Sequence, residues 1–234
     1  MKIKFKKDFR KFKENQEINL DFDKYDIICL VGKNGSGKST VTYAIQTLCG
    51  TTRKKNYMSI GGRPEEFKEC VSISDNNFKY IDTLCSVRDD PGSYGLSCAA
   101  DEFFDNGGWE TRFSSHGNKL AWMFTKMLKE YMTKDDKSME MNNLLVIDEI
   151  DSGLDINMCF NMGKVGLRNI GNKMRAKILL ITHNPMLLLL LGENERTGIF
   201  DIEKLEYTTA THYIKQVTNG LKIKIDYPRQ EKLL

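Results

Sequence analysis

Long apolar segments are missing from this sequence of 234 residues. The longest run of strongly apolar residues, Met186 to Leu191, has six members, whereas a membrane-spanning helix needs about 20. The first residues alternate lysine with apolar side chains, which is unlike the apolar centre of a signal peptide. We therefore expect a cytoplasmic protein with no membrane partner.

Proline, histidine and net charge are also scarce. The sequence has 4 prolines, 3 histidines and a formal net charge of +3, from 35 basic and 32 acidic side chains. This balance excludes a histone-like protein or an acidic tail, and the 40% of hydrophobic residues excludes a disordered chain. The 6 cysteines include no Cys-x-x-Cys pair, so we expect reduced thiols and not a disulfide framework.

The middle of the chain contains three continuous apolar runs, which predict strands buried on both faces of a sheet. They occupy residues 27–31, 144–147 and 178–181. Apolar residues at helical spacing follow the first run, at 41–48, and separate the other two, at 156–170. Strands that alternate with helices are typical of a parallel sheet. We therefore predict an α/β fold with a mostly parallel sheet flanked by helices.

Both ends of the chain show patterns of antiparallel structure. Residues 3–5 and 18–22 alternate apolar with polar side chains, as half-buried strands do. Near the other end, residues 213–217 and 223–227 flank the turn sequence Thr-Asn-Gly at 218–220. We therefore predict antiparallel strands at the amino terminus and a hairpin at the carboxyl terminus.

The strongest chemical motif is the sequence Gly-Lys-Asn-Gly-Ser-Gly-Lys-Ser at residues 32–39, between the first buried strand and a helix. It fits the phosphate-binding pattern G-x-x-x-x-G-K-[ST], in which glycines let backbone N–H groups and a helix N-terminus face an anion. The lysine would reach the β- and γ-phosphates and the last serine would bind Mg²⁺. A glycine-rich turn without a ligand is the alternative. The predicted nucleotide-binding residues are Gly32, Asn34, Gly35, Ser36, Gly37, Lys38, Ser39 and Thr40, with Ser39 as a metal ligand.

Two acids, Asp148 and Glu149, follow the buried run at 144–147. Ligands of open α/β sheets bind at the carboxyl ends of the strands. We therefore expect Asp148 to bind Mg²⁺ and Glu149 to polarise an attacking water. An acidic helix cap, stabilised by the helix dipole, is the alternative.

Three further segments resemble motifs of ABC-type ATPases, in the order in which that family carries them. Residues 152–155, Ser-Gly-Leu-Asp, resemble the D-loop, and Thr182-His183 resembles the switch histidine. Residues 113–118, Phe-Ser-Ser-His-Gly-Asn, resemble a divergent signature loop, L-S-G-G-Q; Ser115 and Gly117 match its second and fourth positions. The resemblance covers roughly residues 3–185.

This resemblance implies an ATPase whose nucleotide lies between two copies of the chain. Lys38, Glu149 and His183 would be the catalytic residues. Ser115, Gly117 and Asp155 would contact ATP that a second subunit holds in a head-to-tail homodimer. The alternatives are an ordinary turn at the D-loop, a core or cap histidine at His183, and a helix start at Ser115.

The sequence departs from the family in two places. No glutamine occurs between Gln46 and Gln216, although these ATPases usually carry one that senses Mg²⁺ and the γ-phosphate. The segment Arg-Asp-Asp-Pro at 88–91 would substitute, with Asp90 near the metal; a charged turn is the alternative. Phe9 and Phe12 are candidates for stacking on adenine, with core positions as the alternative.

The resemblance also extends to the organisation of the chain. It implies one ABC-type ATPase domain over residues 1–234. In this domain the amino-terminal strands and phosphate loop occupy 1–50, a signature-bearing subdomain 51–140, and the acidic strand, D-loop, switch histidine and terminal hairpin 141–234.

The opening Asp-Phe-Arg-Lys-Phe at 8–12 resembles SMC- and RecF-type ATPases, without the coiled coil of the long SMC proteins. This branch implies a Mg²⁺-dependent ATPase in DNA repair, DNA maintenance or a phage or defence process. An ATP-gated clamp or scaffold for a nuclease or other effector, with little turnover, is the alternative; the order of motifs disfavours a small-molecule kinase. DNA is a candidate partner, and the basic segment 2–13 is the candidate surface for it. The alternative is that these lysines form only the solvent-exposed face of a strand.

Overall fold

The computed structural model describes residues 1–49, 64–85, 143–148, 155–168 and 176–219. Its strands are β1 (Lys2–Phe5), β2 (Glu17–Asn19), β3 (Ile27–Val31), β4 (Val71–Ser74), β5 (Tyr80–Cys85), β6 (Asn143–Asp148), β7 (Lys177–Ile181), β8 (Thr197–Asp201) and β9 (Glu206–Thr208). Its helices are α1 (Lys38–Cys49), α2 (Pro64–Cys70), α5 (Ile156–Phe160), the π-helix η3 (Asn161–Leu167), α7 (Pro185–Gly192) and α8 (Ala210–Asn219).

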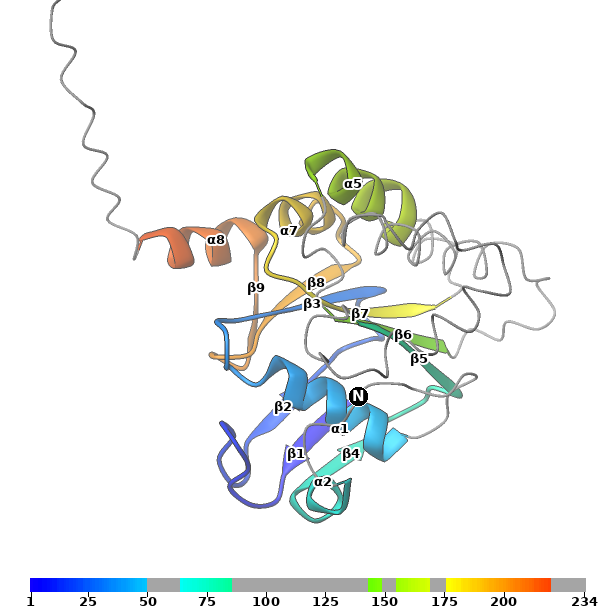
Figure 1. Cartoon of the computed structure of the whole chain (residues 1–234), viewed down its shortest axis with the longest axis vertical. Helices are drawn as coiled ribbons and strands as arrows, with labels where there is room; N and C mark the ends of the chain where they lie inside the picture. The colour runs from blue at the N-terminus through cyan, green and yellow to red at the C-terminus, as the bar shows by residue number, and fades with distance from the viewer. Residues whose placement is uncertain (50–63, 86–142, 149–154, 169–175, 220–234) are drawn as a thin grey trace, which may run out of the picture.

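A six-stranded sheet with the order β5-β6-β7-β3-β8-β9 forms the centre of the fold (Figure 1). Neighbouring strands from β5 to β8 are parallel, and β9 is antiparallel to β8. Every residue of β3, β6 and β8 is buried, because helices or a second sheet cover both faces. The predicted α/β fold with a mostly parallel sheet is confirmed.

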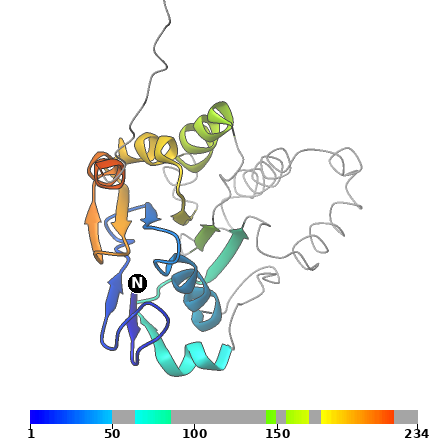
Figure 2. The ribbon, with the colours of Figure 1, turned by 60° about the vertical axis from the view of Figure 1, so that its left-hand side comes forward.

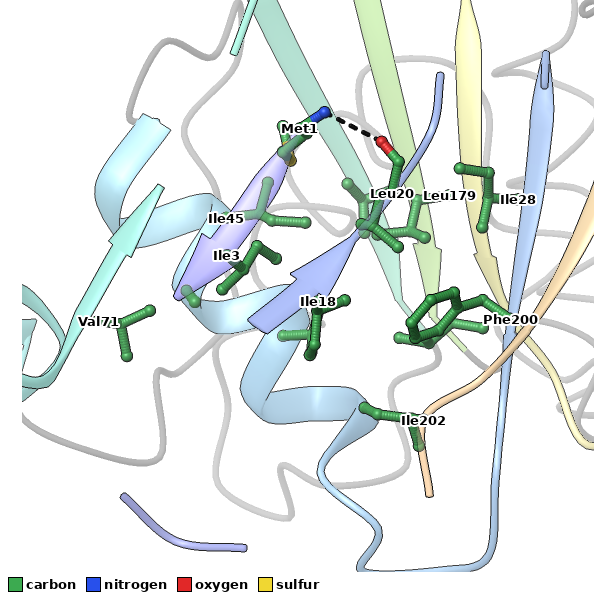
Figure 3. Packing of buried hydrophobic residues seen from close by; sticks show 14 of the residues in the cluster. Met1, Ile3, Ile18, Leu20, Ile28, Ile45, Val71, Leu179, Phe200 and Ile202 are labelled. Atoms are coloured by element: carbon green, nitrogen blue, oxygen red, sulfur yellow. Dashed lines mark hydrogen bonds between the residues drawn. The ribbon is translucent and has the colours of Figure 1, made fainter. Parts of the chain in front are cut away.

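A smaller antiparallel sheet, with the order β2-β1-β4, contains the amino terminus. In β1 the side chains of Ile3 and Phe5 are buried and those of Lys2 and Lys4 are exposed, as their alternation predicts. Figure 3 shows Ile3 in the core that this sheet shares with the central one; there the Met1 amino group donates a hydrogen bond to the Leu20 carbonyl at 3.0 Å. The predicted antiparallel portion at this end is also confirmed.

The central sheet separates two hydrophobic cores, and alternate residues of β3 face one or the other. Ile28 and Leu30 pack with α1 and the small sheet. Ile27, Cys29 and Val31 pack with α7 and η3. Figures 1 and 2 show α1 on one side of the sheet and α5, α7 and α8 on the other. Among the described residues, no helix is both long and apolar enough to cross a membrane.

The predicted terminal hairpin is wrong in its first strand, because residues 213–217 lie in α8. The Thr209 hydroxyl accepts a hydrogen bond from the His212 N–H at 3.2 Å, which caps the first turn. Ala210 is buried and Tyr213, three residues later, packs against the same core. The apolar residues of this segment therefore follow a helical period, which five alternating positions alone do not distinguish from a strand. Residues 223–227 lie outside the described part.

The predicted helix at 156–170 is confirmed over its described part, as α5 followed by η3. Gly163 allows a close contact there: a Cβ atom at this position would lie 2.7 Å from Leu187 Cδ1 in α7. The glycine thus lets the two helices approach. The helical stripe expected at 120–131 lies outside the described residues.

Candidate functional site

The glycine-rich loop connects the carboxyl end of β3 to the start of α1. Gly32, Gly35 and Gly37 have backbone φ angles of 151°, 75° and 105°, which residues with a Cβ atom rarely adopt. The Gly37 carbonyl accepts the Val41 N–H at 3.1 Å, so the helix continues directly from the loop. The first N–H groups of a helix have no partner within the helix. The sequence therefore folds here into a backbone form that suits an anion.

The side chains of Phe12 and Ile202 pack closely against this loop. A Cβ atom at Gly32 would lie 2.6 Å from Ile202 Cγ2, and one at Gly37 would lie 2.6 Å from the Phe12 ring. Phe12 itself stacks on Phe5, with ring centroids 4.1 Å apart. Phe9 and Phe12 are both buried, so they are core residues and neither presents a ring face that could stack on adenine.

The ammonium group of Lys38 lies inside the loop. The side chain is only 5% exposed, and its Nζ atom donates to the carbonyls of Gly32 at 2.9 Å and Lys33 at 3.0 Å. The Ser36 hydroxyl is buried and has no hydrogen-bond partner among the described residues. Buried hydroxyls are seldom left without a partner. The loop thus combines an enclosed positive charge with a donor that a ligand oxygen would satisfy.

Ser39 and Thr40 follow in the first turn of α1 and differ in exposure. Ser39 is exposed, whereas Thr40 is buried and its hydroxyl accepts a hydrogen bond from Arg10 Nη1 at 3.3 Å. The Arg10 guanidinium also lies over the rings of Phe9, at 5.5 Å, and Phe67, at 5.2 Å. It adds a positive charge beside the loop that the motif search did not identify as part of the site.

Asp148 lies at the carboxyl ends of the parallel strands, where the glycine-rich loop also lies. It is the last residue of β6 and pairs with Ile181 of β7, which in turn pairs with Leu30 of β3. The carboxylate is therefore two strands from the loop, about 10 Å at the usual strand spacing. Asp148 and the exposed Ser39 are both oxygen donors.

Oxygen donors of this kind fit Mg²⁺, which proteins commonly hold with one or two carboxylates and the phosphates of a substrate. Among the described residues, no group of three or more His, Cys, Asp or Glu is placed to hold a metal by itself. The donor set at this edge therefore suits a metal shared with a phosphate ligand.

Asp155 and His183, from two of the motif-like segments, lie just before α5 and α7, and these two helices contact each other. The buried Thr182 follows β7 directly, and its hydroxyl accepts the Asn184 N–H at 2.9 Å; His183, the next residue, is exposed. The carboxylate of Asp155 accepts the Met158 N–H at 2.8 Å and caps α5. Asp155 thus has a structural role in addition to the predicted contact with nucleotide.

Four of the predicted site residues lie outside the described part of the chain and stay predictions. They are Glu149, Asp90, Ser115 and Gly117. Of these, Glu149 follows Asp148, the last residue of β6, in the sequence.

Three further residues near the loop belong to no motif in the sequence. Asp201 ends β8 beside Val31 and is buried. Glu203 Oε2 lies 3.5 Å from the Lys33 backbone nitrogen, and the Tyr213 hydroxyl is in hydrogen-bond contact with the backbone of Gly32. Burial raises the pKa of Tyr213, so its hydroxyl stays protonated at neutral pH. No local motif marks these positions, because each comes from a segment more than 160 residues further along the chain.

Comparisons with known proteins bear on this site and on the fold. Residues 1–88, less than half of the chain, match the family model of an AAA ATPase domain. No curated protein matches the sequence. The crystal structure of Stu0660 of Streptococcus thermophilus is similar, with a TM-score of 0.50 and 14% identity over 98% of this chain and 82% of that chain. The structure of cbiO1 from Clostridium perfringens, part of the ABC transporter complex cbiONQ, has a TM-score of 0.41 and 15% identity over 91% of this chain and 88% of that one.

The similarity to Stu0660 shows a shared α/β fold. The match at residues 1–88 covers the glycine-rich loop and α1. Together with the geometry of the loop, these findings support a P-loop ATPase domain that binds a nucleotide.

Proposed function

We propose that this chain is a Mg²⁺-dependent ATPase of the ABC type, in its SMC/RecF-like branch, formed by one domain over residues 1–234. The observation that carries the proposal is the loop at 32–37 with the Lys38 ammonium enclosed in it and Asp148 on the same sheet edge. A triphosphate would bind the backbone N–H groups of the loop and the Lys38 charge, and the match to an ATPase domain supports this choice of ligand.

Hydrolysis needs a water held in line with the γ-phosphate and charge stabilisation around it. Glu149 would orient and polarise that water, and Lys38 and His183 would stabilise the charge that develops on the phosphate oxygens. Ser39 and Asp148 would hold Mg²⁺, with Asp90 as a further candidate ligand. The bound metal supplies charge neutralisation at the phosphates.

The exposed positions of His183 and Asp155 support a site completed by a second copy of the chain. In the proposed head-to-tail homodimer, Ser115 and Gly117 of the partner subunit would contact the γ-phosphate, with Asp155 nearby. ATP would join the two subunits and hydrolysis would release them.

The cellular role that we propose is DNA repair, DNA maintenance or a phage or defence process in the cytoplasm. The basic segment 2–13 would contact DNA: Lys4 and Lys7 are exposed there, whereas Lys2 pairs with Asp75 at 3.3 Å and Lys13 with Asp8 at 2.8 Å. The second candidate is an ATP-gated clamp for a nuclease or other effector. The absence of glutamine between residues 46 and 216 favours slow turnover and therefore this candidate.

Calorimetric titration with Mg²⁺ATP tests the nucleotide site through Lys38→Ala. Loss of the enclosed charge should weaken ATP binding about 10- to 100-fold, the worth of hydrogen bonds to a charged group. Lys33→Ala is the matched control, because the Lys33 side chain is exposed on the same loop and its removal should change affinity less than about threefold. Unchanged affinity in a folded Lys38→Ala protein would remove this loop from the proposed function.

A further inference from the structure

Asn184 connects three parts of the fold beside the proposed site. It lies between the end of β7 and the first residue of α7, directly after His183. Its backbone and both ends of its side-chain amide make hydrogen bonds to different elements.

The first contact fixes the backbone around His183. The Asn184 N–H donates to the Thr182 hydroxyl at 2.9 Å, which closes a small turn with His183 at its centre. Thr182 is only 1% exposed, so one side of this turn is anchored in the core. The backbone of His183 is thereby held between two tethered neighbours.

The second contact caps α7. The Asn184 Oδ1 atom accepts the N–H groups of Met186 at 3.0 Å and Leu187 at 3.3 Å, and Pro185 occupies the first turn. Asparagine is among the preferred residues at this position, and a cap alone requires only the oxygen of the amide.

The third contact uses the other end of the amide and crosses to α5. The Asn184 Nδ2 atom donates to Cys159 Sγ at 3.1 Å, and Cys159 is fully buried. Helix α5 begins after Asp155, the residue that ends the D-loop-like segment. This bond uses the amide donor, which the cap does not need, and it joins the residue that caps α7 to α5.

We propose that Asn184 is a positioning residue for ATP hydrolysis, which holds His183 in a fixed position relative to α5 through its bond to Cys159. This inference rests on the proposed function, because it assigns Asn184 a part in the same reaction. The link makes the turn that carries His183 and the helix that follows the D-loop-like segment act as one unit. Removing the link should therefore slow the chemical step without weakening ATP binding.

Asn184→Ser isolates the link, because serine keeps a capping oxygen and the backbone N–H, adds no charge and is too short to reach Cys159. Cys159→Ala removes the same bond from the other side and leaves the cap intact. Asn194→Ser is the matched control: Asn194 also accepts a backbone N–H, from Arg196 at 2.9 Å, in the turn between α7 and β8.

Single-turnover phosphate release, ATP affinity and thermal unfolding are measured for the wild type, these variants and the Asn184→Ser/Cys159→Ala double variant. Each of the first two changes should slow phosphate release about 3- to 10-fold, the worth of one hydrogen bond, with ATP affinity unchanged. Asn184→Ser should leave Tm close to the wild-type value, whereas Cys159→Ala should lower Tm because it removes a buried sulfur. The double variant should be no slower than the slower single one. The control should hydrolyse like the wild type.

Three results would overturn the inference alone: a wild-type rate in Asn184→Ser, losses of rate that multiply in the double variant, or a loss of rate in Asn184→Ser that comes with weaker ATP binding and a lower Tm. A wild-type protein that binds and hydrolyses no ATP would instead overturn the proposed function, and this inference with it.

Discussion

Glycine is required at position 37 for two separate reasons. Its φ angle of 105° is strained for any residue with a Cβ, and that Cβ would lie 2.6 Å from the Phe12 ring. Gly37→Ala should therefore destabilise the protein by about 2–5 kcal/mol, from backbone strain and overpacking together. Urea unfolding measures the change.

Gly35→Ala is the matched control for this prediction. Gly35 also has a positive φ, of 75°, but nothing lies within 4 Å of its Cβ position. Its substitution should cost only the strain of the left-handed backbone, about 1–2 kcal/mol. Equal losses in the two variants would show that the contact with Phe12 is unimportant.

At this scale the sequence predicts the residues that belong to a contiguous motif and misses those that do not. The pattern of glycines and lysine at 32–39 correctly predicted a loop between a buried strand and a helix. Arg10, Glu203 and Tyr213 come to the loop only through folding, since the register of the sheet and the packing of α8 decide their positions. No spacing within the sequence reports those distances.

At the scale of the elements, an ion-pair cluster joins the amino ends of β3, β7 and β8, at the opposite end of these strands from the glycine-rich loop. Asp26 Oδ1 accepts from Lys177 Nζ and Arg196 Nη2, each at 2.7 Å, and Oδ2 accepts from Arg196 Nε at 2.7 Å. Burial alone would raise the pKa of Asp26, but the hydrogen bonds from Arg196 and Lys177 outweigh it, and the pKa is lowered. The folded state therefore favours the ionised carboxylate.

This lowered pKa predicts how the stability changes with pH. The ordinary pKa of 3.8 applies in the unfolded chain, so the stabilisation by Asp26 is fully present above that pH and is lost as the pH falls through the lower folded-state pKa. Asp26→Asn should cost about 1–3 kcal/mol at pH 7. The difference from wild type in urea unfolding should shrink below pH 4, whereas the exposed Asp23→Asn should show little difference at either pH. A difference that persists undiminished at acid pH would contradict this role.

Two helices show where the prediction of elements fails. No element was predicted over α7, in which five of the eight residues are leucine, because a uniformly apolar run has no period that separates a buried helix from a strand. In α8 the polar turn sequence at 218–220 suggested a hairpin, although the Thr209 cap and the contact of Tyr213 with the core select a helix. Both outcomes depend on packing against neighbouring elements.

On the scale of the whole molecule, the mostly parallel character of the central sheet was predictable, because β3, β6 and β7 contain continuous apolar runs separated by helices. β3 leads into the loop, β6 ends at Asp148 and β7 leads into His183. The two cores then place the small sheet and α1 on one side and α7 and α8 on the other (Figure 2). The order of β8 and β9 beside β3 has no counterpart in the sequence pattern.

The central claim, ATP hydrolysis in a two-subunit sandwich, is tested most directly by Glu149→Gln. Glutamine keeps the size of the side chain but removes the charge that polarises water, while Asp148 and the loop stay intact. Glu195→Gln, in the turn after α7, is the matched control. Phosphate release and size-exclusion light scattering are measured together with Mg²⁺ATP.

The account predicts that Glu149→Gln still binds ATP, releases phosphate roughly 10²–10⁴-fold more slowly and accumulates as a dimer, while the control behaves like the wild type. Lost turnover without a dimer would keep the role of Glu149 and contradict the two-subunit sandwich. Phosphate release at the wild-type rate would contradict the proposed mechanism, because it would remove Glu149 as the residue that polarises the attacking water.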